Sequence, residues 1–177
     1  MELYHHGVKG QRWGVRRYQN PDGSLTPAGK QRYKKVTITK GSVNASNEIF
    51  KTLNSKDRKL VAGDNSRVFI KKGNEKYLVD QVLLKIGDTP VAAFDIWNNG
   101  DGEANVSIMT REGYRGKGYA DKVVKAGIEA FEKNKDLNVL TWGAYIENDK
   151  SRNLAQKNGF KEDEINDEWA IYKRKKE

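Results

Sequence analysis

The most informative part of this 177-residue chain is Val106-Ser-Ile-Met-Thr-Arg-Glu-Gly-Tyr-Arg-Gly-Lys-Gly-Tyr-Ala120. Its apolar start ends at Thr110, which is typical of a strand, and a loop rich in glycine and arginine follows. From Lys117 to about Asn134 apolar residues recur at i, i+3, i+4, i+7, i+8 and i+11, which is one face of a helix. These apolar residues are Ala120, Val123, Val124, Gly127, Ile128 and Phe131. The pattern predicts a strand, a glycine loop and an amphipathic helix.

This arrangement predicts an anion site at the start of the helix. The first N–H groups of a helix have no partner inside it, and the helix dipole is positive there. Gly116 and Gly118 allow a phosphate close to the backbone, and Arg111, Arg115 and Lys117 add positive charge. The loop is not the P-loop of NTPases, because no Gly-Lys-Ser/Thr ends it. Glycine spacing alone also fits a second interpretation, in which the glycines only form a tight turn into a packed helix.

Two motifs carry a family resemblance. Arg115-Gly-Lys-Gly118-Tyr-Ala120 resembles the Arg/Gln-x-x-Gly-x-Gly/Ala signature of the GCN5-related N-acetyltransferases, abbreviated GNAT. About 30 residues later, Asn148-Asp-Lys-Ser-Arg-Asn-Leu-Ala-Gln-Lys-Asn-Gly-Phe160 resembles the second motif of that family, a helix closed by Gly-Phe. The resemblance extends from about Val36 to the C-terminus.

The resemblance implies a mixed α/β fold, with a mostly antiparallel sheet flanked by helices. It also implies an acetyl-CoA cleft between two splayed central strands, one ending at Thr110 and the other near Ile146. The backbone of the first strand would pair with the pantetheine arm, the loop amides would hold the pyrophosphate, and the last helix would touch the arm from the other wall. The residues expected at acetyl-CoA are Ile108, Met109, Thr110, Arg115, Gly116, Lys117, Gly118, Tyr119, Ala120, Asn148 and Ser151. For Ile108, Met109 and Tyr119, ordinary packing is the alternative.

Direct acetyl transfer to an amine needs a neutral amine, a polarised thioester carbonyl and a proton for the departing thiolate. A backbone N–H near Met109 is the candidate partner of the carbonyl. Glu103 and Asp95 are the candidate bases, since a carboxylate in the apolar centre of a sheet has a raised pKa; alternatively, Glu103 only solvates a turn.

The residue expected to protonate the departing thiolate differs from the family pattern. Many members carry a tyrosine immediately after the leucine of the last helix, whereas here Ala155 follows Leu154. Tyr145 or a water molecule is the candidate replacement, and weak catalysis is the alternative.

The composition limits the classes of protein to which this chain can belong. The chain carries 33 basic and 24 acidic residues, a net charge of +9. It has no cysteine, which excludes disulfides, thiol nucleophiles and cysteine metal sites. No apolar run approaches the length of a membrane span, and no signal peptide is apparent, so we expect a protein of the bacterial cytoplasm or one carried in a phage particle.

Residues 1–35 form a basic leader that we expect to be flexible or to dock on a partner. They hold eight basic and two acidic residues, a net of +6 that leaves +3 for residues 36–177. The stretch Tyr4–Lys30 resembles a leader of phage and prophage structural proteins, which implies a phage origin and a phage structural partner. Its basic and aromatic residues also suit nucleic acid, but a solvated basic tail or a protein-docking segment is the favoured explanation. His5-His6 lacks companions for a metal site, so we expect none.

The remaining elements follow from alternation, caps and turns. We expect helices capped by Ser46 or Asn47 and by Ser55, the second ending at Gly63, on the acceptor side of the resembled fold. Thr26-Pro27 predicts a short helix to about Tyr33. Strands are expected at Val36–Thr39, residues 67–71, Tyr77–Ile86, Val91–Trp97, Glu103–Thr110, Asn138–Ile146 and Trp169–Lys173, the last closing the sheet, with a helix at Asp149–Asn158.

Two functions remain open from the sequence. The first is an acetyl-CoA-dependent N-acetyltransferase of phage or prophage origin. The second is a binding or structural module that keeps the fold without catalysis. The intact Arg-x-x-Gly-x-Ala loop favours the enzyme, the missing tyrosine and the leader leave room for the module, and the acceptor is not indicated.

Overall fold

The computed structural model describes residues 18–32, 34–62 and 69–176, and the chain divides into one unit up to Lys35 and a second from Val36. In the first unit, α1 (Pro27–Arg32) is the short helix expected after Thr26, whose Oγ1 accepts a hydrogen bond from the Gly29 N–H. The leader's residues 1–17, with His5-His6, lie outside the described residues, so its proposed partners stay predictions.

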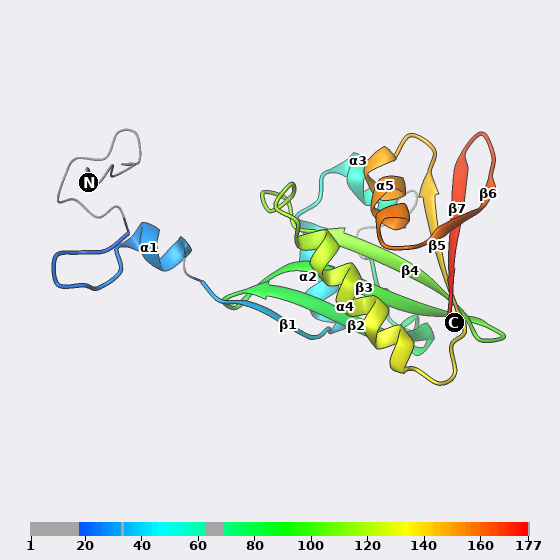
Figure 1. Cartoon of the computed structure of the whole chain (residues 1–177), viewed down its shortest axis with the longest axis horizontal. Coiled ribbons are helices and arrows are strands. Elements are labelled where there is room, and N and C mark those ends of the chain that lie inside the picture. Colours follow the sequence, from blue (N-terminus) through cyan, green and yellow to red (C-terminus); the bar gives the residue numbers. More distant parts are fainter. Residues whose placement is uncertain (1–17, 33, 63–68, 177) are drawn as a thin grey trace, which may run out of the picture. The chain divides into compact units, whose positions relative to one another are not determined.

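The second unit is built on a seven-stranded sheet in the order β1-β2-β3-β4-β5-β7-β6 (Figure 1). Every neighbouring pair is antiparallel except β4 and β5, which are parallel. The mixed, mostly antiparallel sheet is therefore confirmed. The strands are β1 (Val36–Lys40), β2 (Leu78–Ile86), β3 (Thr89–Gly100), β4 (Glu103–Thr110), β5 (Val139–Tyr145), β6 (Lys161–Ile165) and β7 (Trp169–Lys175).

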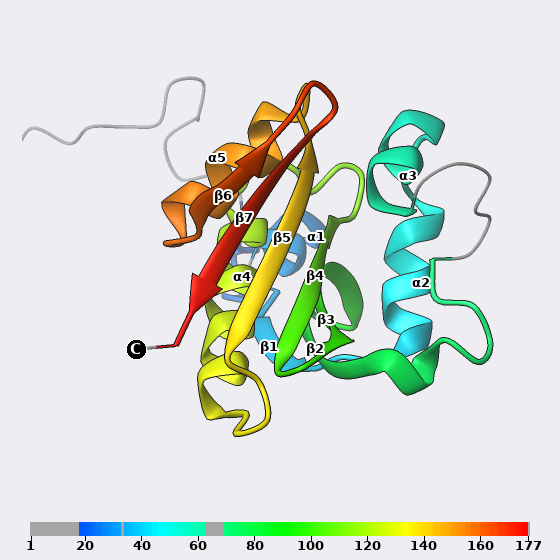
Figure 2. The ribbon, with the colours of Figure 1, turned by 90° about the vertical axis from the view of Figure 1, so that its right-hand side faces the viewer.

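Helices lie on both sides of this sheet. They are α2 (Val43–Lys51), α3 (Ser55–Ala62), α4 (Tyr119–Lys133) and α5 (Asp149–Lys157), with a 3-10 turn at Glu75–Tyr77. Figure 2 shows α4 and α5 on one side and α2 and α3 on the other. Following the expectation from the family resemblance, we call the first side the cofactor face and the second the acceptor face. No helix in the described part of the chain is long and apolar enough to cross a membrane.

The cofactor face carries the larger core. Alternate residues of the central strands pack against α4 and α5, because successive side chains of a strand point to opposite faces. Gly127 of α4 lies directly on the Phe94 ring: a Cβ at Gly127 would be 2.2 Å from the ring's Cδ1. The close contact explains a glycine in the middle of a helix, where it would otherwise cost stability.

The acceptor face carries a smaller core under α2. Ile49 and Phe50 of α2 are fully buried there, together with Leu83 of β2, Ala93 of β3 and Met109 of β4. The principal contacts of α2 and α3 on the sheet fall on β3 and β4. The described helices thus cover only part of this face.

Several sequence expectations are corrected. Helix α2 begins earlier than expected because Ser42 caps it by accepting from the Ala45 N–H, and α3 is capped by Asn54 rather than Ser55. Residues 69–71 form no strand; residues 63–68, with the expected stop at Gly63, lie outside the described residues. The sheet also ends in a strand that the sequence did not predict, since β6 pairs outside β7.

Candidate functional site

The two central parallel strands separate halfway along their length. Strands β4 and β5 pair at only three positions, from Glu103↔Val139 to Asn105↔Thr141. Beyond these positions both strands continue (Figure 2), but Val106–Thr110 of β4 does not pair with Trp142–Tyr145 of β5. The second half of β4 therefore has no paired strand along the edge that faces β5.

The direction of the backbone groups on that edge follows from one hydrogen bond. The Arg111 N–H donates to the Val91 carbonyl of β3 at 2.7 Å. In a regular antiparallel ladder the pairing direction alternates from residue to residue, and β3 and β4 are in continuous register here. Met109 therefore directs its backbone groups to β3, whereas Ile108 and Thr110 direct theirs toward β5. The free N–H groups nearest Met109 are those of its two neighbours.

The loop before α4 leaves its amides open. Gly116 and Gly118 have φ of 73° and 78°, a region that favours glycine, and a Cβ at either would meet nothing within 4 Å. Gly118 is the N-cap of α4, and the Lys122 N–H donates to the Gly118 carbonyl at 3.2 Å. The amides of Tyr119 and Ala120 precede it and point out of the helix end.

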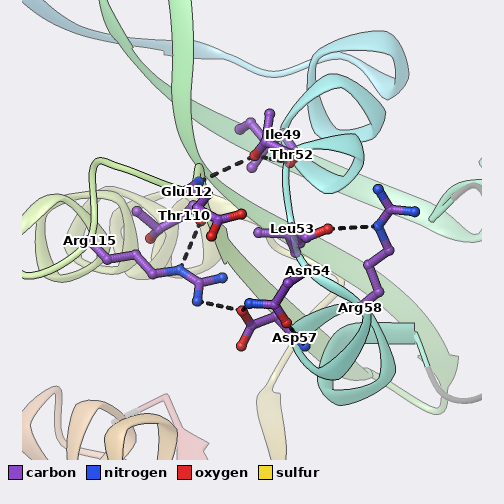
Figure 3. A network of polar contacts seen from close by, with 9 residues as sticks. All are labelled: Ile49, Thr52, Leu53, Asn54, Asp57, Arg58, Thr110, Glu112 and Arg115. Atoms are coloured by element: carbon purple, nitrogen blue, oxygen red, sulfur yellow. Dashed lines mark hydrogen bonds and ion pairs between the residues drawn. The ribbon is translucent and has the colours of Figure 1, made fainter.

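The cations of the loop are engaged by the chain itself (Figure 3). Arg115 donates from Nη1 to Asp57 of α3 at 2.7 Å, and its Nε is 3.4 Å from the Thr110 carbonyl. The Glu112 N–H donates to Thr52 Oγ1 at 3.3 Å. The loop is thereby attached to the α2–α3 hairpin.

The two other loop cations are also held. Arg111 forms an ion pair with Glu48 of α2. Lys117 Nζ donates to the Gly113 carbonyl at 3.0 Å and lies 5.1 Å from the centre of the Tyr114 ring. The sequence predicted these cations but not the ion pairs of Arg111 and Arg115, because partners 63 and 58 positions away along the chain leave no local signal.

The residues expected on the second wall have structural partners. The Asn148 side chain caps α5 by accepting from the Ser151 N–H at 3.2 Å. The Ser151 hydroxyl accepts from the Trp142 indole N–H at 3.0 Å. Both lie at the start of α5, directly beyond the end of β5. Ala155, which stands where many family members have tyrosine, is fully buried.

Tyr145 lies at the open end of the split. It is the last residue of β5, and its ring stacks on Trp169 of β7 with centres 3.8 Å apart and an angle of 32°. Trp142 and Ala144 belong to the core of the cofactor face, so the alternation places Tyr145 on the acceptor face. Its hydroxyl has no hydrogen-bond partner among the described residues.

Asp95 is fully buried beneath α2. Its Oδ1 accepts from Gln81 Nε2 at 2.6 Å and from Ser46 Oγ at 2.9 Å, while Oδ2 has no partner in the described part of the chain. Burial raises its pKa to about 6 against the opposing effect of these two hydrogen bonds. The carboxyl is enclosed by Ser46 and Gln81, and it has no exposed surface with which to touch an acceptor.

Glu103 lies at the other end of β4 from the loop. It stands in the paired part of the two strands, where its carboxylate accepts a hydrogen bond from Thr141 Oγ1 and lies 3.9 Å from Lys173 Nζ. The structure does not bring Glu103 together with Thr110 and the glycine loop. The described residues also contain no group of three or more histidine, aspartate or glutamate side chains that could hold a metal ion.

Comparisons with known proteins agree with this geometry. The family model described as "Acetyltransferase (GNAT) domain" matches residues 52–161. No curated protein sequence matches the chain.

Solved structures share the fold at low sequence identity. The GNAT domain of PAT from S. lividans has 11% identity and a TM-score of 0.65, over 79% of this chain and 90% of that one. The yncA protein from Salmonella typhimurium, solved with its cofactor acetyl-CoA, has 12% identity and a TM-score of 0.63, over 80% of this chain and 94% of that one. The spermidine N-acetyltransferase from Vibrio cholerae, solved with CoA and spermine, has 14% identity and a TM-score of 0.62, over 79% and 95%.

The family match covers more than half of the chain and includes the glycine loop, α4, the split between β4 and β5, and α5. The fold of the solved relatives extends the likeness to about four fifths of the chain. The chain therefore belongs to the GNAT acetyltransferase family.

Proposed function

We propose that residues 36–177 transfer the acetyl group of acetyl-CoA to an amine. The observation that carries this proposal is the combination of an unpaired β4 edge with open amides at the start of α4. Both features offer hydrogen-bond donors to one extended ligand: the edge suits the amides of a pantetheine arm, and the helix start suits a pyrophosphate. The yncA structure supports acetyl-CoA as that ligand.

In this proposal the chain places acetyl-CoA along the edge of β4. The backbone groups of Ile108 and Thr110 pair with the pantetheine arm, and the amides from Gly116 to Ala120 hold the pyrophosphate. The thioester then lies between β4 and β5, where the N–H of Ile108 or Thr110 donates to its carbonyl oxygen. Such a donor stabilises the negative charge that develops there during acyl transfer.

The reaction itself is a direct transfer. The nitrogen of a neutral amine attacks the thioester carbon, the carbon–sulfur bond breaks, and CoA leaves as a thiolate that takes up a proton. Tyr145 is the proposed proton donor, because it lies at the open end of the split and its hydroxyl has no other partner in the described residues. The proton of the amine passes to water on the acceptor face. Buried Asp95 and distant Glu103 are assigned to the scaffold of the sheet.

The alternative is a GNAT-fold module without catalysis. The buried Ala155 in place of the family tyrosine favours it, and so does the ion pair that occupies Arg115. A phage particle or host partner for such a module, and a phage origin for the chain, rest only on the resemblance of the leader. Acetyl transfer in the presence of an amine separates the two functions directly.

Calorimetric titration with acetyl-CoA tests the site. Gly118→Glu places a carboxylate at the N-cap of α4, where it repels the pyrophosphate, so we expect binding to be lost. Gly73→Glu is the matched control: Gly73 has φ of 92° and an equally open Cβ position, so the backbone strain is similar while the site is untouched. Equal binding by the wild type and both variants would refute the proposed site. Binding without acetyl transfer to any amine would favour the module.

A further inference from the structure

Strand β1 lies at one edge of the sheet and has backbone groups that β2 does not use. The Gly41 N–H donates to the Gln81 carbonyl at 2.7 Å, directly beyond the β1–β2 ladder, whose antiparallel register is continuous. Because the pairing direction alternates along such a ladder, Thr37 and Thr39 direct their backbone groups to β2. The residues whose N–H and C=O groups point away from the sheet are Val36, Ile38 and Lys40.

The side chains of this edge are apolar and uncovered. Val36 and Ile38 pair with Ile86 and Leu84 of β2, which belong to the core of the cofactor face, so all four side chains lie on that face. Leu84 is fully buried, whereas Val36 and Ile38 are 40% and 47% exposed. Helix α4 packs mainly on β2, β3 and β4, so the margin formed by β1 extends beyond the helix.

The opposite edge of the sheet is built differently. Strand β6 is exposed throughout, and its register with β7 is shifted between Glu162 and Glu164. Charged side chains and a bulge of this kind hinder the pairing of a further strand. By contrast, β1 has no such shift and alternates threonine with valine and isoleucine, which are favoured in strands. Of the two edges, β1 is therefore the one suited to accept an added strand.

The surroundings of β1 are basic. Between Lys30 and Asn47 the sequence contains no acidic residue, and the carboxylates of Asp80 and Asp88 lie beyond the two ends of the β1–β2 ladder. The lysines at or next to this edge are Lys34, Lys35, Lys40 and Lys85. A second copy of β1 would bring its own lysines here, and like charges across a strand pair are destabilising. An acidic strand would instead be attracted.

We propose that β1 binds an extended acidic segment of another protein as an eighth strand of this sheet. The segment runs antiparallel to β1, and its main chain pairs with the outward N–H and C=O groups. One of its apolar side chains covers Ile38, and its acidic residues lie near the lysines at the ends of the strand. Strands β2 and β3 separate this edge from the split between β4 and β5, so docking here is independent of acetyl transfer.

A labelled peptide, Glu-Thr-Val-Thr-Val-Thr-Glu, titrated with the full chain and followed by fluorescence anisotropy, provides the test. Its first valine is designed to lie opposite Ile38. The matched peptide Lys-Thr-Val-Thr-Val-Thr-Lys has the same centre and the opposite charge, and we expect it to bind about tenfold more weakly. N-methylation of the first valine removes the N–H that would donate to the Ile38 carbonyl, and it should also weaken binding about tenfold. Affinity for the acidic peptide should decrease as salt is raised.

A pair of variants assigns the binding to this edge. Ile38→Glu removes the apolar contact and repels the acidic peptide, so we expect an affinity at least about tenfold lower. Ile165→Glu is the matched control, because Ile165 is 50% exposed on β6 at the opposite edge, and it should leave the affinity unchanged. Both isoleucines are exposed, so both variants should fold, and circular dichroism checks this.

Amide hydrogen exchange followed by NMR tests the strand register itself. Without peptide, the N–H groups of Thr37 and Thr39 should be protected by β2, and those of Ile38 and Lys40 should exchange rapidly. Addition of the acidic peptide should slow the exchange of Ile38 and Lys40 selectively. Protection that appears only outside β1 would overturn the proposal.

The remaining outcomes also decide. Absence of binding by the acidic peptide, equal binding of the two charged peptides, or equal affinity of the wild type and Ile38→Glu would each refute a docking edge at β1. Self-association of the chain in sedimentation, abolished by Ile38→Glu, would show that a second copy occupies this edge and would overturn the proposed partner. Titration with acetyl-CoA should give the same affinity for Ile38→Glu as for the wild type, so failure of the proposed function leaves the peptide results intact.

Discussion

The two faces of the sheet are built on different principles. The cofactor face is apolar and closed: α4 and α5 cover the central strands, and fully buried side chains such as Phe94, Phe131 and Leu140 fill the space. The acceptor face is covered by α2 over β3 and β4 and contains a buried aspartate, while at its β5 and β7 part Gly143 is exposed and Tyr145 and Trp169 are half-buried. One sheet thus presents a rigid support on one side and a polar, partly open surface on the other.

This difference suits the division of labour in the proposed reaction. The pyrophosphate site needs a fixed helix end, which requires α4 to be held firmly by packing. An acceptor site needs accessible groups, which requires that some of the sheet stay uncovered. The comparison predicts that equivalent substitutions on the two faces have unequal effects on stability.

Replacing a glycine by alanine on each face should show the largest contrast. Gly127→Ala places a Cβ 2.2 Å from the Phe94 ring, so helix and ring must separate, and we expect a loss of about 3 kcal/mol in the free energy of unfolding. Gly143→Ala meets no atom closer than 3.6 Å and should change stability by less than about 1 kcal/mol. Urea unfolding followed by circular dichroism measures both. Equal losses would mean that the two faces do not differ in packing.

Asp95 should give the acceptor face its own pH dependence. Its pKa in the folded chain is about 6, above the ordinary aspartate value of 3.8, so the folded state binds a proton more tightly than the unfolded state. The penalty for burying the charge is absent below pH 4. It grows as the pH rises and is complete above pH 6, at about 3 kcal/mol.

Asp95→Asn should remove this dependence. The free energy of unfolding of the wild type should decrease between pH 4 and pH 7 relative to that of the variant, and denaturant unfolding across this range checks it. Asp163→Asn, which changes an exposed aspartate on β6, is the control and should leave the slope in place. A wild type whose stability rises over the same range, relative to Asp95→Asn, would contradict the buried, unpaired carboxylate.

Much of this architecture was predictable because it depends on local pattern. The apolar period from Ala120 to Phe131 and the glycine at 118 indicated α4 and its start, and the family signature lies on the same residues. The β3–β4 turn and the Gly159 stop likewise depend on residues close in sequence. The structure has Gly159 at φ of 80°, directly after Asn158, the C-cap of α5.

What the sequence did not indicate depends on distant partners or on weak patterns. Strand β6, Lys161-Glu-Asp-Glu-Ile165, is exposed throughout and lacks an apolar alternation, so only its pairing with β7 makes it a strand. Ser46 resembled a helix cap, yet it lies inside α2 and donates to Asp95, 49 positions away. Glu103 was a candidate base because it is a carboxylate on β4, and only the register with β5 shows that it stands at the closed end of the split.

The smallest expected effect concerns the loop that joins the two faces. Arg115 of the glycine loop is paired with Asp57 of α3, a helix without buried residues, so the carboxylate competes with a pyrophosphate for the guanidinium. Exposed pairs contribute roughly 0.2–1 kcal/mol, so Asp57→Asn should tighten acetyl-CoA binding by about threefold. Glu132→Gln removes a comparable pair with Arg174 at the far end of α4 and should leave the affinity unchanged in the same calorimetric titration. Weaker binding by Asp57→Asn would mean that the pair holds the loop in its binding conformation, so that the acceptor-side helices support the cofactor site rather than compete with its ligand.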